Sequence, residues 1–334
     1  MQTIIHIVPS YPPIKGGIAD FCKLIVNSLN EKKHYIISYQ QNAVICGSTN
    51  KVLINYKNFS LKKYLQFTLN NIPSNTSITL MLHYVSYGYH KYGVPNFLFK
   101  DIRSFSSQLK LITFFHEIYS IGKKTPKQSS FWCKPLQKSI ILKLSKISHT
   151  VFTSNDLYKE KIENLGVSKS ILIQNIYSNV GELKDFPSNK KQQLVIFGGK
   201  GLKKNIVHHI DSVEKKVHSL KIDEIINVGA PLSINSINNK TIKDLGYLAT
   251  NDIETLFKTA KYGLISYNNM PIEKSGVFAA YAAYGIIPIL INSQVTSPKL
   301  KTIISEPLQL FNWYKENASI TCFSNKLNTI INGY

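Results

Sequence analysis

The stretch "NMPIEKSGVFAAYAAYGIIPIL", residues 269–290, is apolar enough to resemble a membrane span. A span needs about 20 apolar residues without a break, whereas Gly285 and Pro288 interrupt this one. Breakers at these two positions predict a helix over residues 276–284, followed by a buried strand over residues 287–291. The stretch is therefore expected to form one helix–strand unit of an α/β domain rather than a membrane anchor.

The rest of the chain shows the same alternation of short apolar runs and longer amphipathic runs. This order predicts parallel sheets whose strands are joined by crossover helices. Strands are predicted at residues 3–8, 35–38, 77–82, 109–115, 150–153, 171–174, 194–197, 224–228, 262–266 and 287–291. Helices are predicted at residues 18–29, 131–145, 155–165, 206–220 and 252–260, with Ser154 as the cap and Gly166 as the stop of the third.

The length of 334 residues favours two domains. The polar, Pro- and Gly-bearing segment at 178–192 is the predicted boundary, so the domains are expected at residues 1–180 and 190–309. The tail at about 310–334 has helical spacing and is free to pack on either domain, including back on the first. The opening run "QTIIHIVP" is expected to be a strand and not a leader, and four cysteines without a CxxC pair suit a reducing cytoplasm.

Positive charge is unevenly distributed along the chain. The whole sequence carries a formal charge of +21, and residues 51–150 hold 15 Lys and Arg against Asp101 and Glu117 alone. Such a field suits nucleic acid, an anionic membrane surface or a phosphorylated substrate. Only Arg103 among the 40 basic residues is arginine. Because base readout relies on arginine, a nucleic-acid partner is disfavoured and a peripheral position on the inner face of the cell membrane is favoured.

A glycine turn follows the first predicted strand, where "PSYPPIKGGIADF" places Gly16 and Gly17. In open α/β sheets such a turn lies at the carboxyl edge of the strands, where ligands bind. The segment lacks GxGxxG, and no acidic residue follows the second strand in the dinucleotide pattern. A Rossmann oxidoreductase is therefore disfavoured, and a tight turn without a ligand is the alternative.

A second glycine turn, in "VIFGGKGLKKN", opens the second half. Gly199 precedes Lys200, and Lys203 and Lys204 follow within one turn. The spacing GxxxxGK[ST] is absent, so hydrolysis of a nucleoside triphosphate is not indicated. Glycines with lysines at a strand end suit a diphosphate, and a solvated lysine cluster is the alternative.

The predicted helix start at Ser275 and Gly276 is a third position of this kind. Free backbone N–H groups and the helix dipole attract anions to a helix N-terminus. The alternative is that Ser275 is only a cap and Gly276 only a packing glycine. Taken together, the three turns predict a phosphorylated ligand in a cleft between the two domains.

Two histidines follow predicted strands, His83 in "HYVSYGYHKYGVP" and His116 in "FFHEIY". Both are placed to meet a ligand at a sheet edge, although buried or surface histidines are common. The sequence holds no HExxH motif and no Asp-x-Asp pair, and the nearest acidic pair, Asp252 and Glu254, is expected in the first turn of a helix. A site for a divalent metal is therefore not expected.

These motifs resemble GT-B glycosyltransferases of the GT4 type over nearly the full length. The resemblance implies two Rossmann-like parallel-sheet domains facing a central cleft, with acceptor binding in the first and binding of the nucleotide sugar in the second. "NVGAP" and "DLGYLATNDIETLFKTA" match the family's base-binding turns, and "EKSGVFAAYAAYGIIPIL" matches its acidic motif, except that Ala280 or Tyr281 stands where a second glutamate is usual. The resemblance assigns sugar-donor binding to Gly16, Gly17, Gly199, Lys200, Lys204, Gly229, Tyr247, Leu248, Ser275, Gly276 and Val277.

The activity implied is transfer of a hexose-type sugar from a nucleotide-diphosphate sugar to a glycan or polyprenyl-linked acceptor in bacterial capsule or O-antigen synthesis. Retention of configuration is expected, with no cofactor and no metal. Candidate catalytic residues are His116, Asp20 as a general base if configuration inverts, and Glu273. Alternatives are a sugar-nucleotide 2-epimerase of the same fold or a silent sugar-binding partner of an assembly complex. Candidate acceptor-side residues are His83, Tyr87 and Tyr89.

Overall fold

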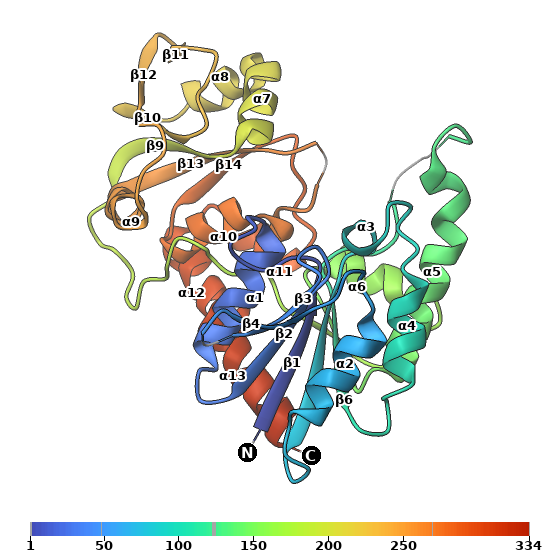
Figure 1. Ribbon diagram of the computed structural model, residues 1–334. Helices are drawn as coiled ribbons and strands as arrows, with labels where there is room; N and C mark the ends of the chain where they lie inside the picture. Colours follow the sequence, from blue (N-terminus) through green and yellow to red (C-terminus); the bar gives the residue numbers. More distant parts are fainter. Residues whose placement is uncertain (1, 48, 122–124, 269, 334) are drawn as a thin grey trace. The chain divides into compact units, whose positions relative to one another are not determined.

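The computed structural model describes residues 2–47, 49–121, 125–268 and 270–333. The chain forms two compact units (Figure 1), which are described separately. Unit 1 comprises Met1–Gln174 and Ser324–Tyr334, and unit 2 comprises Asn175–Phe323. The chain therefore leaves unit 1 once and returns to it inside its last helix, α13 (Ile320–Asn332).

Unit 1 is built on an eight-stranded sheet in the order β4-β3-β2-β1-β5-β6-β7-β8. The neighbouring strands β2-β1-β5-β6-β7-β8 pair in parallel, whereas β3 is antiparallel to both β2 and β4. The central strands are almost completely buried, as expected for a parallel sheet covered on both faces. The strand bounds are β1 (Gln2–Val8), β2 (Lys33–Ser38), β3 (Ala43–Cys46), β4 (Lys51–Asn55), β5 (Ser77–Tyr84), β6 (Lys110–Phe115), β7 (Thr150–Thr153) and β8 (Ile171–Ile173).

Helices cover both faces of this sheet (Figure 1). One apolar cluster joins Cys22 and Val26 of α1 (Gly17–Ser28) to strand residues, and a larger cluster on the other face takes in Leu65, Leu98 and Ile141. The remaining helices of unit 1 are α2 (Leu61–Asn70), α3 (Ser86–Tyr89), α4 (Asn96–Arg103), α5 (Ser129–Ile147) and α6 (Asp156–Glu163).

Unit 2 is built on a six-stranded sheet in the order β11-β12-β10-β9-β13-β14, parallel except for β11. The strand bounds are β9 (Lys191–Gly198), β10 (Glu224–Gly229), β11 (Ser236–Ile237), β12 (Lys240–Asp244), β13 (Ala260–Ser266) and β14 (Ile287–Ile291). The helix bounds are α7 (Lys200–His208), α8 (Ile210–His218), α9 (Thr250–Thr259), the 3₁₀ turn η1 (Ile272–Lys274), α10 (Gly276–Ala283), α11 (Pro298–Ile303) and α12 (Pro307–Asn317).

The predicted α/β class and all ten predicted strands are confirmed. Residues 269–290 contain α10 and β14, as predicted, and no helix within the described residues is long and apolar enough to cross a bilayer. The sequence did not predict the hairpin of β3 and β4, because β4 is short and mostly exposed and so lacks a buried apolar run.

Two details of the predicted helices are wrong. The helix expected at 206–220 is two helices, α7 and α8, because His209 leaves the helical region at φ −115° and ψ 34°. Asn155, not Ser154, caps α6, since its side chain accepts from the N–H of Tyr158. The tail, which the sequence left free to pack on either domain, is divided between them: Trp313 and Tyr314 of α12 lie in the core of unit 2, and the chain rejoins unit 1 at Ser324.

A tyrosine of α10 completes the backbone pairing of β9. β13 pairs with β9 as far as Val195, and beyond that point the Tyr281 hydroxyl donates to the Val195 carbonyl and accepts from the Phe197 N–H, both at 3.0 Å. A Cβ on Gly263 would lie 2.3 Å from the Tyr281 ring. Gly263 therefore makes room for this ring to lie against the sheet.

Tyr281→Phe should lower the free energy of unfolding by about 1–3 kcal/mol, because it leaves a buried carbonyl and a buried N–H without partners. Gly263→Ala should cost about 1–3 kcal/mol through the steric clash with the ring. Urea unfolding measures both, with Tyr247→Phe as the control, since the Tyr247 side chain is 78% exposed and its loss should change stability by less than about 0.5 kcal/mol. Equal midpoints for all three variants would contradict the bridging role of Tyr281.

Candidate functional site

The carboxyl ends of β9 and β10 in unit 2 meet at two glycines. Gly198 and Gly229 are register partners, and the N–H of Ala230 donates to the Gly198 carbonyl at 3.2 Å. Gly229 has φ +97°, and a Cβ there would lie 2.7 Å from the Gly198 oxygen. The glycine is thus required by the close approach of two backbones, a reason that holds with or without a ligand.

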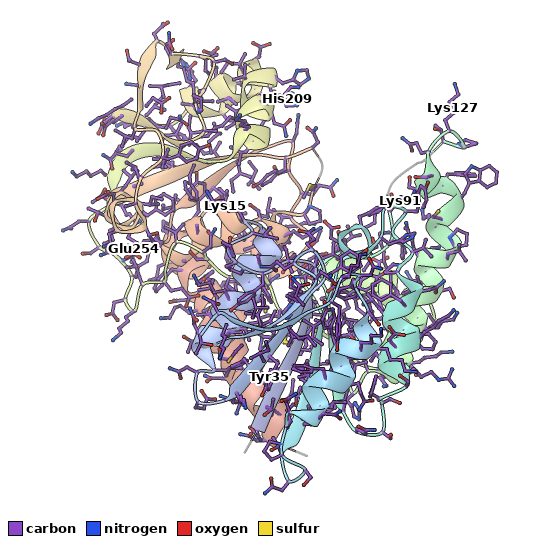
Figure 2. All side chains as sticks on the ribbon, in the orientation of Figure 1. Lys15, Tyr35, Lys91, Lys127, His209 and Glu254 are labelled. Carbon is purple, nitrogen blue, oxygen red and sulfur yellow. The ribbon has the colours of Figure 1, made fainter. Side chains whose placement is uncertain are left out.

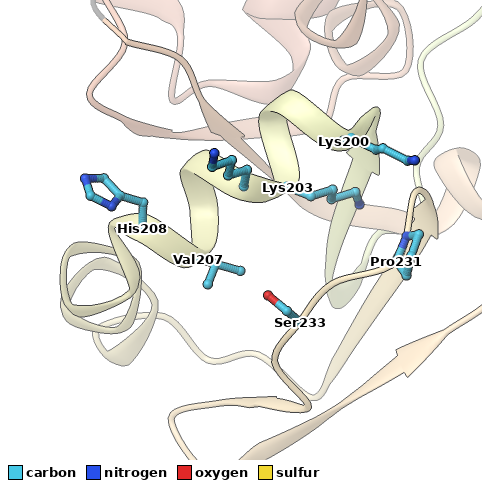
Figure 3. A pocket seen from close by; sticks show the side chains of 7 residues that line it. Lys200, Lys203, Val207, His208, Pro231 and Ser233 are labelled. Atoms are coloured by element: carbon cyan, nitrogen blue, oxygen red, sulfur yellow. The ribbon is translucent and has the colours of Figure 1, made fainter.

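Helix α7 starts at this edge and carries the lysine cluster. Gly199 is its N-cap, and Lys200 and Lys204 are exposed. A pocket of about 410 Å³ lies against the helix (Figure 3). Its lining residues come from α7 and from the segment after β10: Lys200, Lys203, Lys204, Val207, His208, Pro231 and Ser233. The last four were not singled out from the sequence: Pro231 ends the quoted motif "NVGAP", and the other three lie outside the quoted motifs.

Lys203 differs from its two neighbours in burial. Its side chain is 2% exposed, and its Nζ donates to the side-chain oxygen of Asn227 and to the carbonyls of Ile196 and Val228. Burial lowers the pKa of Lys203 to about 7, opposed by the carboxylate of Asp244. Lys203 therefore ties α7 to β9 and β10, which leaves Lys200 and Lys204 as the lysines of this helix with exposed charge.

The N-terminus of α10 lies at the same edge of the sheet. The Ser275 hydroxyl caps the helix by accepting from the Phe278 N–H at 3.1 Å, and it shares a 2.9 Å hydrogen bond with the Tyr267 hydroxyl. Val277 reaches the β9 turn, since its Cγ2 lies 3.3 Å from a Cβ built on Gly198. Within the described chain, a Cβ on Gly276 would meet nothing closer than 4 Å. Packing therefore does not explain Gly276, and the helix end is open to a ligand.

Glu273 lies just before this helix and is 1% exposed. Its Oε1 accepts from the Thr296 N–H, the Thr296 hydroxyl and the Ser297 N–H at 2.6–3.0 Å, which holds the segment before α11. Its Oε2 is buried without a hydrogen-bond partner among the described residues. The structure thus gives Glu273 a positioning role at the edge and exposes almost none of it to a sugar.

The base-binding candidates follow β12. The Gly246 carbonyl accepts from the Gly229 N–H at 2.6 Å, which fixes the backbone next to them. Tyr247 is highly exposed and Leu248 is half-buried. The Gly229–Gly246 hydrogen bond thus holds the segment after β12 next to the glycine pair of β9 and β10. The aromatic ring of Tyr247 remains exposed in this segment.

In unit 1, Gly16 caps α1 and Gly17 begins it, and both are exposed. Added Cβ atoms there would meet no described atom within 4 Å, so this helix end is open as well. Asp20 lies in the first turn, where partial burial raises the pKa of its carboxyl group and Lys23 opposes the shift. A raised carboxyl pKa is compatible with acid–base work.

The histidine and tyrosine candidates of unit 1 are mostly interior. His83 and Tyr89 have no exposed surface, and the Tyr89 hydroxyl lies 3.0 Å from the carbonyls of Ile7 and His83. Neither side chain can touch an acceptor in this structure, because other protein groups enclose it. His116 is 3% exposed, whereas Tyr87 is 43% exposed.

His83 and His116 belong to a line of four buried histidines. The His83 Nδ1 lies 3.1 Å from the His116 Nε2, the His6 Nδ1 lies 3.2 Å from the His83 Nε2, and the His34 Nδ1 lies 3.0 Å from the His6 Nε2. Burial lowers the pKa values of His6, His34 and His83. Sequence analysis missed His6 and His34 because neither belongs to a motif: His6 interrupts an apolar run, and His34 lies just before the strand predicted at 35–38.

One group of potential metal ligands lies along this line. Ligand atoms of His6, Cys22 and His83 lie within 4.8 Å of one another. Burial raises the pKa of the Cys22 thiol, so the neutral thiol is the form favoured there in the absence of a cation. Two members of this group, His6 and His83, already share the 3.2 Å hydrogen bond between the His6 Nδ1 and the His83 Nε2.

Comparisons with known proteins support the architecture. No protein-family model and no curated protein matches the sequence. A solved α-glucosyltransferase in complex with UDP-glucose and DNA containing an abasic site matches with a TM-score of 0.54 at 11% identity, over 99% of both chains. A trehalose 6-phosphate synthase from Burkholderia multivorans matches with a TM-score of 0.53 at 9% identity, over 100% of this chain and 98% of that one. The fold is GT-B.

A putative UDP-N-acetylglucosamine 2-epimerase from Listeria monocytogenes also matches, with a TM-score of 0.52 at 12% identity over 98% of this chain and 95% of that one. The GT-B fold is thus shared by proteins named for two kinds of chemistry. Identities of 9–12% establish the fold alone, so the activity has to be argued from the residues of this chain.

The buried histidines of this GT-B protein should make unit 1 sensitive to acid. Their pKa values lie below the ordinary 6.5 in the folded state, so the unfolded state binds more protons as the pH falls. Stability should be fully present above pH 6.5 and lost below it, by about 1.4 kcal/mol per pH unit for each histidine that titrates. Hydrogen exchange of the β1 and β5 amides, corrected for intrinsic rates, measures the loss.

The β9 and β10 amides of unit 2 are the control for this experiment, because His208, His209 and His218 are exposed or half-buried. Equal pH dependence in the two units would show that the line of histidines does not set the acid sensitivity.

Proposed function

We propose that the protein is a glycosyltransferase that moves a sugar from a nucleotide-diphosphate sugar to a glycan or polyprenyl-linked acceptor of a bacterial surface polysaccharide. One observation carries the proposal: the exposed Lys200 and Lys204 line a pocket of about 410 Å³ against α7, and the open N-terminus of α10 lies at the same edge of the sheet. Cationic side chains and free N–H groups at one edge suit the two phosphates of such a sugar donor.

The chemistry follows from where charge develops. When the glycosidic bond to the diphosphate breaks, negative charge grows on the leaving oxygen while the sugar becomes oxocarbenium-like. Lys200, Lys204 and the N–H groups of Gly276 and Val277 at the start of α10 would stabilise that charge, because the Ser275 N–H already donates to the Ile272 carbonyl at 2.8 Å. No divalent metal or other cofactor enters this scheme. Gly276 has open space, so a phosphate oxygen can approach the helix end closely.

Unit 1 by itself carries further candidate groups for the reaction. Gly16 and Gly17 leave the start of α1 open to a ligand, and Asp20 in the same turn is the candidate general base if configuration inverts. His116, 3% exposed at the end of β6, is the candidate for contact with the sugar. Retention is proposed from the resemblance of the "EKSGVFAAYAAYGIIPIL" motif, with Glu273 acting through the segment that it holds.

Lys204→Ala should lower turnover by about 10²–10³, because it removes one cation that stabilises the leaving diphosphate. Stability should change little, since Lys204 is exposed. The measurement is release of nucleoside diphosphate with a panel of nucleotide sugars, after a thermal-shift screen in which a ligand at 100 times its Kd stabilises by about 2.7 kcal/mol. Lys240→Ala, an exposed lysine on β12, is the matched control.

Wild-type turnover in folded Lys204→Ala protein would refute the role given to the pocket. Conversion of the nucleotide sugar without any acceptor would instead show an epimerase. Nucleotide-sugar binding without turnover, over a panel of glycan and polyprenyl-phosphate acceptors, would show a silent binding partner.

A basic and aromatic surface on unit 1 supports docking on an anionic membrane. Phe131, Trp132 and Leu136 of α5 are large apolar residues with 41–67% exposure, and Lys134 and Lys138 lie between and beside them. Residues 118–155 contain no Asp or Glu. Exposed lysines such as Lys91 and Lys127 extend from the same unit (Figure 2). Aromatic side chains with lysines are the combination that binds an anionic bilayer interface.

Binding to vesicles that contain anionic lipid should weaken as salt rises and should fall further in Trp132→Ser, because about 1 kcal/mol per lysine comes from the surface potential and the rest from apolar insertion. Vesicle flotation measures the bound fraction, and neutral vesicles give the baseline. Leu308→Ser, a residue of unit 2 that is 51% exposed, is the control. If vesicle binding does not depend on salt, or if Trp132→Ser and Leu308→Ser reduce it equally, the surface on α5 does not dock on the membrane.

A further inference from the structure

The four histidines form a diagonal line across the sheet of unit 1. The register pairs Ile4 with His34, so His6 lies two residues further along the neighbouring strand. The same step recurs twice, since His6 pairs with Met81 two residues before His83 and His83 pairs with Phe114 two residues before His116. A step of two keeps every side chain on one face, so the line runs from the start of β2 to the carboxyl edge after β6.

The hydrogen bonds along this line have one possible direction while the rings are neutral. His34 Nε2 lies 2.9 Å from the carbonyl of Leu29, which can only accept, so this nitrogen carries the proton. The His34 Nδ1 is then an acceptor, and His6 must donate to it from Nε2. The same reasoning passes through His83 to His116, because a neutral imidazole has one N–H and one lone pair.

We infer that the Leu29 carbonyl, acting through His34, His6 and His83, fixes His116 as the Nε2–H tautomer with its Nδ1 lone pair as the working atom. His34, His6 and His83 are positioning residues, and His116 is the residue that they present at the sheet edge. The His116 Nδ1 is buried in this structure, so a group that binds it must be a hydrogen-bond donor that reaches below the protein surface, such as a sugar hydroxyl. The kinetic consequence rests on the proposed transfer reaction, whereas the tautomer does not.

The residues around the histidine line hold the imidazole rings in a fixed orientation and keep them neutral. Rings along it are nearly parallel, with interplanar angles of 26°, 28° and 13°. The Phe21 ring meets His116 edge-on at 4.7 Å and Phe114 stacks on it at 4.2 Å, which holds the imidazole plane. Burial keeps the inner rings neutral, and dipoles aligned in one direction strengthen one another, so electron density is pushed toward the His116 Nδ1.

A metal ion is the competing explanation for part of this line. An ion bound by His6, Cys22 and His83 would take the one lone pair of each neutral imidazole and so break the sequence of N–H···N bonds. The hydrogen-bonded arrangement is favoured because the flanking pairs, to His34 and to His116, lie 3.0 and 3.1 Å apart, close to the 3.2 Å of the central pair.

The test is nuclear magnetic resonance of the full chain with isotope-labelled histidine rings, near neutral pH and without substrate. The expected spectrum shows four neutral Nε2–H rings and nitrogen–nitrogen couplings across the three N–H···N bonds. A proton on the His116 Nδ1, or no coupling in the folded wild type, would overturn the inference. Bound zinc at one ion per chain that disappears in Cys22→Ser would overturn it as well.

Two substitutions of His34 distinguish the effect of its hydrogen bonds from the effect of its volume. His34→Gln keeps one acceptor and one donor, so His116 should retain its tautomer, whereas His34→Leu removes the anchor and should give a mixture. His149→Gln is the control, because the His149 Nδ1 accepts from the Leu111 N–H outside the line. If His34→Leu fails to fold, the wild-type spectrum still decides.

Turnover provides a separate readout for the same variants. His34→Leu should lower kcat about tenfold with an unchanged KM for the sugar donor, and His34→Gln should restore most of it. Equal kcat in all variants would show that the histidine line does not affect catalysis. An inactive wild type would count against the proposed function, and the spectra would still determine the tautomer of His116.

Discussion

Parallel pairing of β9 with β10 and β13 is the constraint on which the candidate site depends. Strands that run the same way must release their connecting turns at the same edge, so the starts of α7 and α10 lie close to the Gly198–Gly229 pair. Two helix N-termini and two exposed lysines then concentrate positive potential in one place. In the proposed function, this arrangement would bind a diphosphate without relying on a cluster of carboxylates.

Buried polar groups in this protein are used to fix geometry. The Nζ of Lys203 donates hydrogen bonds to three oxygen atoms of β9 and β10, and this fixes the helix that carries Lys200 and Lys204. The histidine line does the same in unit 1, where each imidazole compensates the desolvation of the next. Such interior networks are costly unless every member is paired, and paired members gain a defined orientation.

Helix α10 carries packing residues where the family that the sequence resembles has a second glutamate. Where a second glutamate is usual in the family that the sequence resembles, this chain has Ala280 and Tyr281, and both are fully buried. The Tyr281 hydroxyl pairs with the backbone of β9, which makes this part of the helix a structural element of the core. Glu273 likewise holds the segment before α11, and the proposed function therefore assigns recognition of the sugar donor to the lysines and the backbone N–H groups.

Sequence alone determined the α/β class, every predicted strand and the glycine turns at their ends, because hydrophobic periodicity and chain breakers are local signals. It also placed Gly276 at a helix start and Lys200 and Lys204 in the turn after a strand, although that helix was predicted only from residue 206 and begins at Lys200. Only the tertiary structure distinguished Lys203 from its neighbours, enclosed His83 and Tyr89, and joined His34, His6, His83 and His116 into one line. Those outcomes depend on strand order and register between residues up to 82 positions apart in sequence, which local pattern does not encode.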